Sequence, residues 1–144
     1  MDTKIVDGFT VAGLSIQATN DDTSKIGQLW QTFYEQIGSM LTESSNIYGV
    51  YTDYESDASG SFELVAASDT LADKHFEGKR LIDIPTGKYL VFRGKGELHQ
   101  TIIKLWTEIW IYFNQKDSPH SRAYTTDFEW YKDNSEIEIY IAII

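Results

Sequence analysis

The chain has 144 residues, of which 42% are hydrophobic and 24% are charged, a composition typical of one globular domain and not of a disordered chain. It contains no cysteine, so disulfides, thiolate metal sites and cysteine nucleophiles are excluded. Its 22 acidic residues outnumber 12 scattered basic residues, for a net charge of −10, which argues against direct binding to nucleic acid, because such binding requires clustered lysine and arginine.

The first half of the chain, residues 1–72, is predicted to contain a strand, a helix and two further strands. Residues 9–16 alternate in polarity and indicate a strand. The helix-capping cluster 20–24 precedes an apolar face that runs to Met40 with the spacing of one side of a helix. Residues 46–54 and 62–67 are typical of two strands separated by a polar loop.

The second half, residues 73–144, repeats this order of elements. Residues 81–93 are extended, and Pro85 and Gly87 permit a kink within them. A second helix is predicted from Leu98 to Phe113. Residues 124–131 and 136–144 then indicate two strands joined by a turn.

The two halves are related by an internal duplication. A shift of 76 residues carries Trp30 and Tyr34 of the first helix onto Trp106 and Trp110 of the second. We therefore expect one α+β domain over residues 1–144, a duplicated βαββ unit with repeats over about 1–72 and 73–144. Its strands should form one antiparallel sheet with the two long helices on one side and a ligand cleft at the pseudo-twofold axis.

Glu129 is the first candidate binding residue. A shift of 80 residues aligns it with Gly49, and it stands between Phe128 and Trp130 in an aromatic strand. A carboxylate sheltered from water in such a strand would bind a cation well, because desolvation disfavours the charged form unless a cation or a hydrogen-bond donor compensates. The alternative is that Glu129 faces solvent on the open side of the sheet.

Aromatic residues, 14% of the chain, supply candidate walls for the cleft. Trp106 and Trp110 lie one turn apart on the second helix, and Tyr131 shares the parity of Glu129 along its strand. The candidate ligand-binding residues are therefore Glu129, Trp106, Trp110, Tyr131, Tyr140 and Tyr51. The alternative for these rings is packing in the core.

No residue pattern indicates catalysis or metal binding. His75, His99 and His120 have no second ligand at a suitable spacing, and no serine lies near a base. No glycine-rich loop of the phosphate-binding kind precedes a helix. We expect no catalytic residue, no metal and no cofactor. Because the chain has no apolar run of membrane-spanning length and no secretory pattern at its start, we also expect a cytoplasmic protein without membrane contact.

Four segments resemble the GyrI-like family, the effector-binding domain of bacterial AraC- and MerR-type transcription activators. They are Ile-Pro-Thr-Gly-Lys-Tyr at 84–89, the second-helix segment 105–110 with its two tryptophans, Phe-Glu-Trp-Tyr at 128–131, and the alternating segment 136–141. The resemblance implies a duplicated βαββ fold and a lipophilic cationic ligand held by the carboxylate of Glu129. It also implies aromatic walls at the candidate residues named above.

The chain lacks a helix-turn-helix region, so it is similar to the stand-alone members encoded on integron gene cassettes. Such a module would act on transcription only through another chain that binds DNA.

The same resemblance leaves two alternative functions open. Some relatives inhibit DNA gyrase, and an acidic protein could present its negative surface to a basic DNA-binding site. A few relatives hydrolyse electrophilic small molecules, a reaction that needs an acid or base beside the substrate; Glu129 could serve, although no second catalytic group is evident. The preferred prediction is a non-enzymatic binding module for cationic, drug-like ligands.

Overall fold

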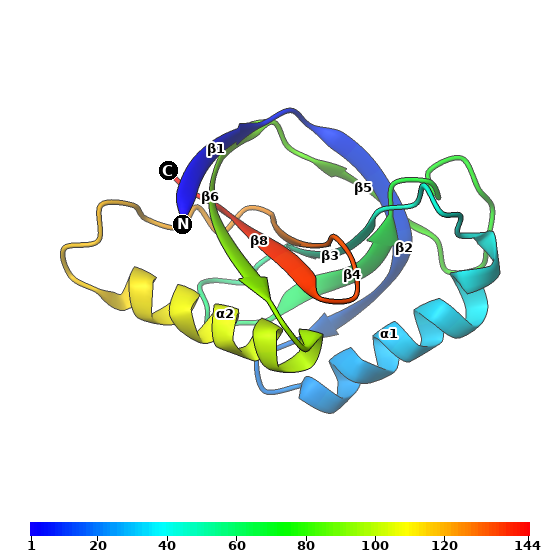
Figure 1. The fold of residues 1–144 in the computed structure, drawn as a ribbon, viewed down its shortest axis with the longest axis horizontal. Coiled ribbons are helices and arrows are strands. Elements are labelled where there is room, and N and C mark those ends of the chain that lie inside the picture. Colours follow the sequence, from blue (N-terminus) through cyan, green and yellow to red (C-terminus); the bar gives the residue numbers. More distant parts are fainter.

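The computed structural model describes residues 1–144 as eight strands and two long helices (Figure 1). In chain order they are β1 (Asp2–Val6), β2 (Phe9–Ala18), α1 (Thr23–Ile37), β3 (Ile47–Thr52), β4 (Phe62–Ser68), β5 (Arg80–Ile84), β6 (Gly87–Lys95), α2 (Leu98–Asn114), β7 (Asp127–Tyr131) and β8 (Glu136–Ala142). A short 3-10 turn, η1 (Gly38–Met40), follows α1. Every predicted element is present, but the extended segment 81–93 is divided into two strands, β5 and β6, which lie apart in the sheet, and β1 is additional.

The eight strands form one antiparallel sheet in the order β1-β6-β8-β7-β3-β4-β2-β5. The central pair, β3 and β7, joins the two halves of the chain, and in it Gly49 lies directly opposite Glu129. Because these residues are also equivalent in the sequence repeat, the pseudo-twofold axis passes between them. The predicted α+β fold, with one antiparallel sheet and two helices, is confirmed.

β1 and β5 each pair with the opposite half of the chain and thereby curl the sheet. β1 pairs with β6 and β5 pairs with β2, in one antiparallel register that runs from Asp2 opposite Val91 to Gly13 opposite Arg80. The exchange brings the sheet round into a nearly closed ring (Figure 1). The side chains of β1 are almost all exposed, so the strand has no apolar alternation by which the sequence could reveal it.

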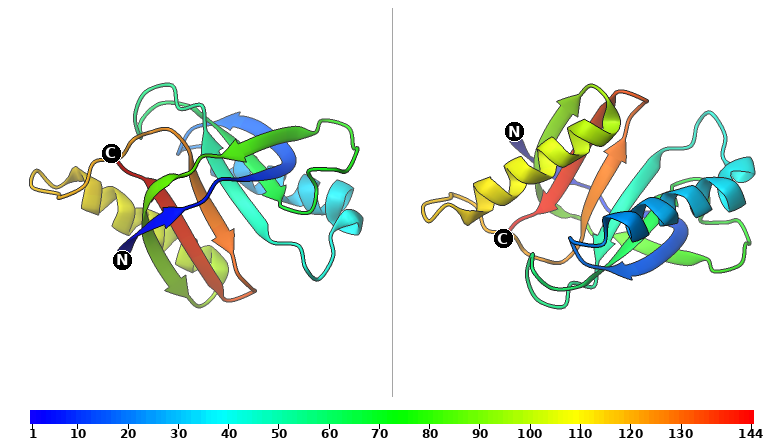
Figure 2. Two further views of the ribbon diagram at one scale, coloured as in Figure 1. Left: turned by 90° about the horizontal axis from the view of Figure 1, so that it is seen from above. Right: turned by 90° about the horizontal axis from the view of Figure 1, so that it is seen from below.

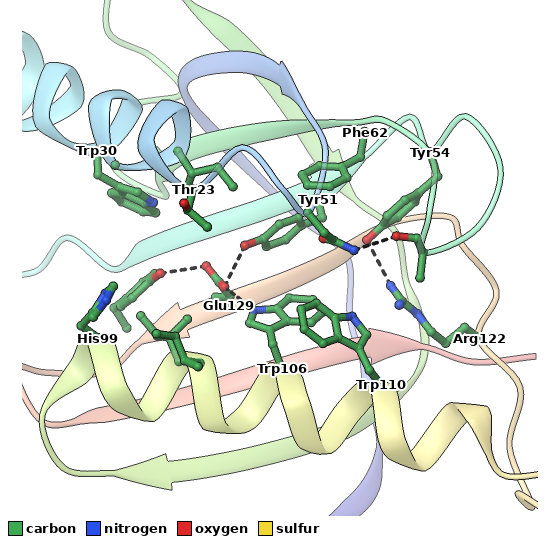
Figure 3. A pocket seen from close by; sticks show the side chains of 17 residues that line it. Thr23, Trp30, Tyr51, Tyr54, Phe62, His99, Trp106, Trp110, Arg122 and Glu129 are labelled. Atoms are coloured by element: carbon green, nitrogen blue, oxygen red, sulfur yellow. Dashed lines mark hydrogen bonds between the residues drawn. The ribbon is translucent and has the colours of Figure 1, made fainter.

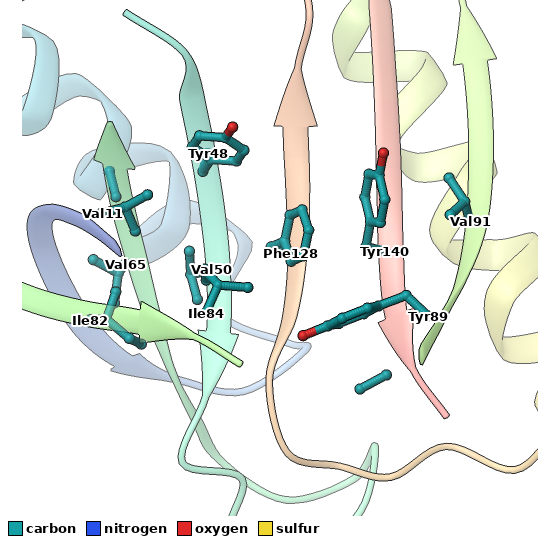
Figure 4. Packing of buried hydrophobic residues seen from close by; sticks show 12 residues of the cluster. Val11, Tyr48, Val50, Val65, Ile82, Ile84, Tyr89, Val91, Phe128 and Tyr140 are labelled. Atoms are coloured by element: carbon teal, nitrogen blue, oxygen red, sulfur yellow. The ribbon is translucent and has the colours of Figure 1, made fainter. Parts of the chain in front are cut away.

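The curl separates two apolar layers. The inner face of the sheet holds a core that includes Tyr48, Phe128 and Tyr140 (Figure 4). On the outer face, α1 packs on strands of the first half and α2 on strands of the second, as the right-hand view of Figure 2 shows. Since successive strand residues point to opposite faces, Glu129 faces the helices whereas its neighbour Phe128 faces the inner core.

The helices are held to the sheet by their apolar stripes. α1 buries Leu29 and Phe33, and α2 buries Leu105 and Ile109. The start of α2 is capped by the carboxylate of Glu97, which accepts hydrogen bonds from two backbone N–H groups. The predicted capping cluster does precede α1, but no side chain in it caps the helix. No helix in the structure is both long and apolar enough to cross a membrane.

Candidate functional site

A cavity of about 480 Å³ lies between α1 and α2, over the centre of the sheet (Figure 3). Most of its lining is apolar or aromatic. The two helices contribute Thr23, Ile26, Gly27, Trp30, His99, Ile102, Ile103, Trp106 and Trp110. The strands and connecting loops contribute Asn20, Tyr51, Tyr54, Ala58, Phe62, Arg122, Glu129 and Tyr131.

Glu129 lies at the sheet side of this cavity and is only 1% exposed. Its Oε2 accepts hydrogen bonds from Nε1 of Trp106, at 2.8 Å, and from the hydroxyl of Tyr51, at 2.9 Å. Its Oε1 accepts a 2.8 Å hydrogen bond from the hydroxyl of Tyr131. The donors come from α2, β3 and β7, so three elements hold the carboxylate in place. The alternative that Glu129 faces bulk solvent is therefore excluded.

The negative charge of Glu129 has no basic partner. None of the ion pairs in the structure includes it, and its three hydrogen-bond donors are neutral. Burial raises the pKa of Glu129 above its ordinary value, and the hydrogen bonds from Trp106, Tyr131 and Tyr51 offset only part of this effect. An arriving cation would supply the compensation that the protein itself does not.

Aromatic rings surround the carboxylate. Trp106 has its ring centroid 5.1 Å from that of Tyr51 and 6.1 Å from that of Trp110. On the other side, the rings of Trp30 and Tyr131 are 5.2 Å apart. The faces of such rings carry partial negative charge and attract cations. The aromatic walls and the carboxylate thus both favour a positively charged ligand.

The helical repeat explains why tryptophans reach the cavity. Ile102, Trp106 and Trp110 are spaced four residues apart, so they form one stripe along α2. The neighbouring stripe, with Leu105 and Ile109, packs on the sheet. Because the two stripes adjoin, the apolar periodicity alone could not show which rings pack on the sheet and which face the groove.

Five of the six predicted binding residues, Glu129, Trp106, Trp110, Tyr131 and Tyr51, line this one cavity. Tyr140 does not. It lies on the inner face of the sheet, where its ring stacks on Phe128 at 4.5 Å and its hydroxyl donates to Glu138. Tyr140 is the cross-strand partner of Phe128, and partners in a pair share a face. The structure therefore removes Tyr140 from the cavity lining.

The structure also adds residues that the sequence analysis did not select. Trp30 lines the cavity as the counterpart of Trp106, and the duplication was the available signal for it. At one end lies a buried ion pair, in which Nη2 of Arg122 donates to Oδ2 of Asp127 at 2.8 Å. Tyr54 donates to the same oxygen at 2.5 Å. Arg122 lies in the irregular connection between α2 and β7, where no periodic pattern marks it.

Comparison with known proteins agrees with this fold. The integron cassette protein VCH_CASS2, from the mobile metagenome of Vibrio cholerae, has a crystal structure similar to this chain, with a TM-score of 0.92 and 42% identity over 99% of this chain and 95% of that one. The "Putative transcriptional regulator protein YobU" of Bacillus subtilis (strain 168) is 28% identical over 148 residues, which cover 92% of this chain and 90% of YobU.

The fold also matches that of SAV2435 in its structure bound to tetraphenylphosphonium, with a TM-score of 0.74 and 17% identity over 99% of this chain and 93% of that one. The resemblance predicted from the sequence is thus confirmed at the level of the fold. The model of the Cass2 family, described as integron-associated effector binding protein, matches residues 4–143, and the chain belongs to that family.

Proposed function

We propose that the chain is an effector-binding protein whose cavity takes lipophilic organic cations. The observation that supports this most directly is the carboxylate of Glu129, which is buried among aromatic rings with three neutral donors and no basic partner. A bound monocation would neutralise that charge without a change in the protein's own ion pairs.

The lining favours an apolar cation over a small hydrated one. A metal ion would need several oxygen or nitrogen ligands, and the structure contains no cluster of three or more histidine or acidic side chains that could hold one. A phosphonium or a dye cation carries its charge on a large apolar body, so it loses little hydration on entry and gains contact with the indole and phenol rings.

Such contacts are sufficient for useful affinity. Each cation–π contact contributes about 0.5–2 kcal/mol. Together with burial of the ligand and its attraction to Glu129, a few of them reach the roughly −8 kcal/mol that corresponds to micromolar binding.

The similar proteins support the proposal in two ways. SAV2435, which has the same fold, binds tetraphenylphosphonium, a ligand of the proposed class. The name of YobU points to a role in transcriptional regulation. In our proposal this chain supplies ligand binding without chemical change of the ligand.

The test compares two ions of the same shape and opposite charge. Tetraphenylphosphonium and tetraphenylborate are titrated into the protein by calorimetry, with tryptophan fluorescence as a second readout. We expect the phosphonium to bind at micromolar concentration and the borate to bind at least tenfold more weakly. Glu129→Gln should weaken phosphonium binding by tenfold or more, which is about 1.4 kcal/mol.

Glu138→Gln is the matched control, because Glu138 is also a buried carboxylate but lies outside the cavity, in contact with Arg93, Lys132 and Tyr140. It should leave phosphonium affinity unchanged. Equal affinity for the two ions, or unchanged phosphonium binding in Glu129→Gln, would contradict the proposed function.

A further inference from the structure

Arg122 occupies the end of the cavity near Tyr54 and Trp110, away from Trp30 and His99 (Figure 3). Its side chain is only 4% exposed. Asp127, its ion-pair partner, precedes Glu129 by two residues on β7, a rise of about 7 Å along the strand. The guanidinium and the carboxylate of Glu129 are therefore two separate polar points in one apolar cavity.

The guanidinium of Arg122 has donors to spare. Both of its hydrogen bonds come from Nη2, which donates to Asp127 at 2.8 Å and to the hydroxyl of Tyr54 at 3.4 Å. Its Nε is buried and has no hydrogen-bond partner, the only such side-chain atom in the structure. A guanidinium carries five N–H donors, so Nε and Nη1 remain without a protein acceptor. Nε is enclosed by the protein, so a guest cannot reach it, whereas Nη1 is not enclosed in this way and remains the donor that a guest in the cavity can satisfy.

The surrounding residues hold Arg122 in this position. Its guanidinium carbon lies 4.4 Å from the ring centroid of Tyr124 and 5.7 Å from that of Tyr54. Tyr124 adopts φ = 54°, a left-handed conformation that is unfavourable for a bulky residue. Strain of this kind persists where the surroundings require a particular geometry, and it gathers at binding sites. Here it places a ring against the guanidinium.

The charges of the cavity residues indicate what net charge a ligand should carry. Arg122 and Asp127 neutralise each other, and Glu129 leaves one uncompensated negative charge. A ligand with one positive charge therefore balances the cavity. A carboxylate on the same ligand would again leave one uncompensated negative charge in the cavity, whereas a carbonyl oxygen accepts hydrogen bonds without adding charge.

We propose that Arg122 forms a second subsite that accepts a neutral hydrogen-bond acceptor, such as a ketone, ester or amide carbonyl, on the far end of the cationic ligand. The proposal rests on the proposed function and narrows its ligand class. The effector is then a monocation whose apolar body carries a carbonyl group directed at Nη1 of Arg122, while its positive charge lies near Glu129.

A purely structural role for Arg122 would not need this arrangement. Neutralising Asp127 occupies Nη2 alone, and Asp127 also accepts hydrogen bonds from Tyr54 and from the backbone N–H of Ala142. The remaining donors of Arg122 contribute nothing to that network. They are the part of the side chain that the fold leaves unused.

The test uses three tetraphenylphosphonium derivatives that differ on one ring: 4-acetyl, 4-isopropyl and 4-carboxylate. Acetyl and isopropyl have nearly the same shape, but only acetyl offers an acceptor. Calorimetry on the wild-type protein should show the acetyl compound binding about tenfold more tightly than the isopropyl compound, the effect of one hydrogen bond to a charged donor. The carboxylate compound should bind more weakly than the acetyl compound.

Arg122→Lys provides the second arm. Lysine keeps a positive charge opposite Asp127, but its single nitrogen is then held by Asp127 and no second nitrogen takes the place of Nη1. We expect the ratio of acetyl to isopropyl affinity to fall towards one in this variant.

The outcomes separate the two proposals. Equal affinities of the acetyl and isopropyl compounds for the wild type, together with phosphonium binding that depends on Glu129, would overturn the subsite and leave the proposed function intact. Tightest binding by the carboxylate compound would overturn the neutral acceptor. A protein that binds no phosphonium at all would refute both.

Discussion

Gly49 and Glu129 face each other across the pseudo-twofold axis, and the glycine leaves the space that the carboxylate occupies. A Cβ atom on Gly49 would come within 2.5 Å of Oε1 of Glu129 and 3.2 Å of Cζ2 of Trp30. A second glutamate at this point would also oppose two buried negative charges. The duplicated fold thus has an asymmetric centre, with the acid in one repeat and the room for it in the other.

Gly49→Ala tests this relationship. The methyl group should displace the carboxylate from the donors of Trp106, Tyr51 and Tyr131, since Oε1 is the nearest atom to it. We expect the affinity for tetraphenylphosphonium to fall about tenfold, or about 1.4 kcal/mol, while the circular dichroism spectrum stays that of the folded protein. Calorimetry measures the affinity.

Gly87→Ala is the control for that substitution, because Gly87 is also a strand residue and a Cβ there meets nothing closer than 3.9 Å. Its phosphonium affinity should equal that of the wild type. If Gly49→Ala also binds as the wild type does, the position of the carboxylate does not determine binding.

Glu129→Gln should make the protein more stable at neutral pH. Burial raises the pKa of Glu129 in the folded protein above its ordinary value of 4.5, so the folded state holds this proton more tightly than the unfolded state does. The associated stability is complete below the unfolded pKa and is lost as the pH rises through the folded pKa, at about 1.4 kcal/mol for each unit of difference. Glutamine carries no charge and has no such loss.

Urea denaturation of both proteins between pH 4 and pH 8 measures this effect. The free energy of unfolding of the wild type minus that of Glu129→Gln should fall with rising pH and then level off. Other titrating groups are common to both proteins and cancel in the difference. A difference that is flat or rises with pH would show that burial does not destabilise the charged form of Glu129.

Much of the fold could be predicted from the sequence, because its apolar residues recur with the regular spacing of helices and strands. The duplication indicates how the helices and strands are arranged, because each repeated unit needs the other to cover its apolar faces. β1 could not be predicted in this way, because it is an edge strand with exposed side chains. The curl of the sheet could not be predicted either. It depends on β1 and β5 pairing with strands of the opposite half, and the local pattern of apolar residues does not determine which strands pair.

In the site, the position of Tyr131 could be predicted from the sequence, whereas that of Tyr140 could not. Tyr131 is on the same strand as Glu129 and two residues away, so its face follows from alternation alone. The face of Tyr140 depends on the register between β7 and β8, and a slip of one residue would reverse it. Arg122 is further out of reach, because it lies in an irregular connection that only the folded chain brings to the cavity.

The tyrosine hydroxyls on Glu129 should control the pH at which cations bind. The cation is attracted to the ionised carboxylate, so affinity should rise with pH through the pKa of Glu129 in the free protein. The hydrogen bonds from Tyr131 and Tyr51 lower that pKa. Tyr131→Phe and Tyr51→Phe each remove one donor, and we expect each to move the midpoint of the binding profile to higher pH.

Titrations with tetraphenylphosphonium from pH 4 to pH 9 provide the midpoints, which report the pKa separately from any change in contact with the ring. Tyr140→Phe is the matched control, because its hydroxyl donates to Glu138 on the inner face and does not reach Glu129. Its midpoint should coincide with that of the wild type. A midpoint that stays fixed in both Tyr131→Phe and Tyr51→Phe would mean that a group other than Glu129 governs the pH dependence of binding.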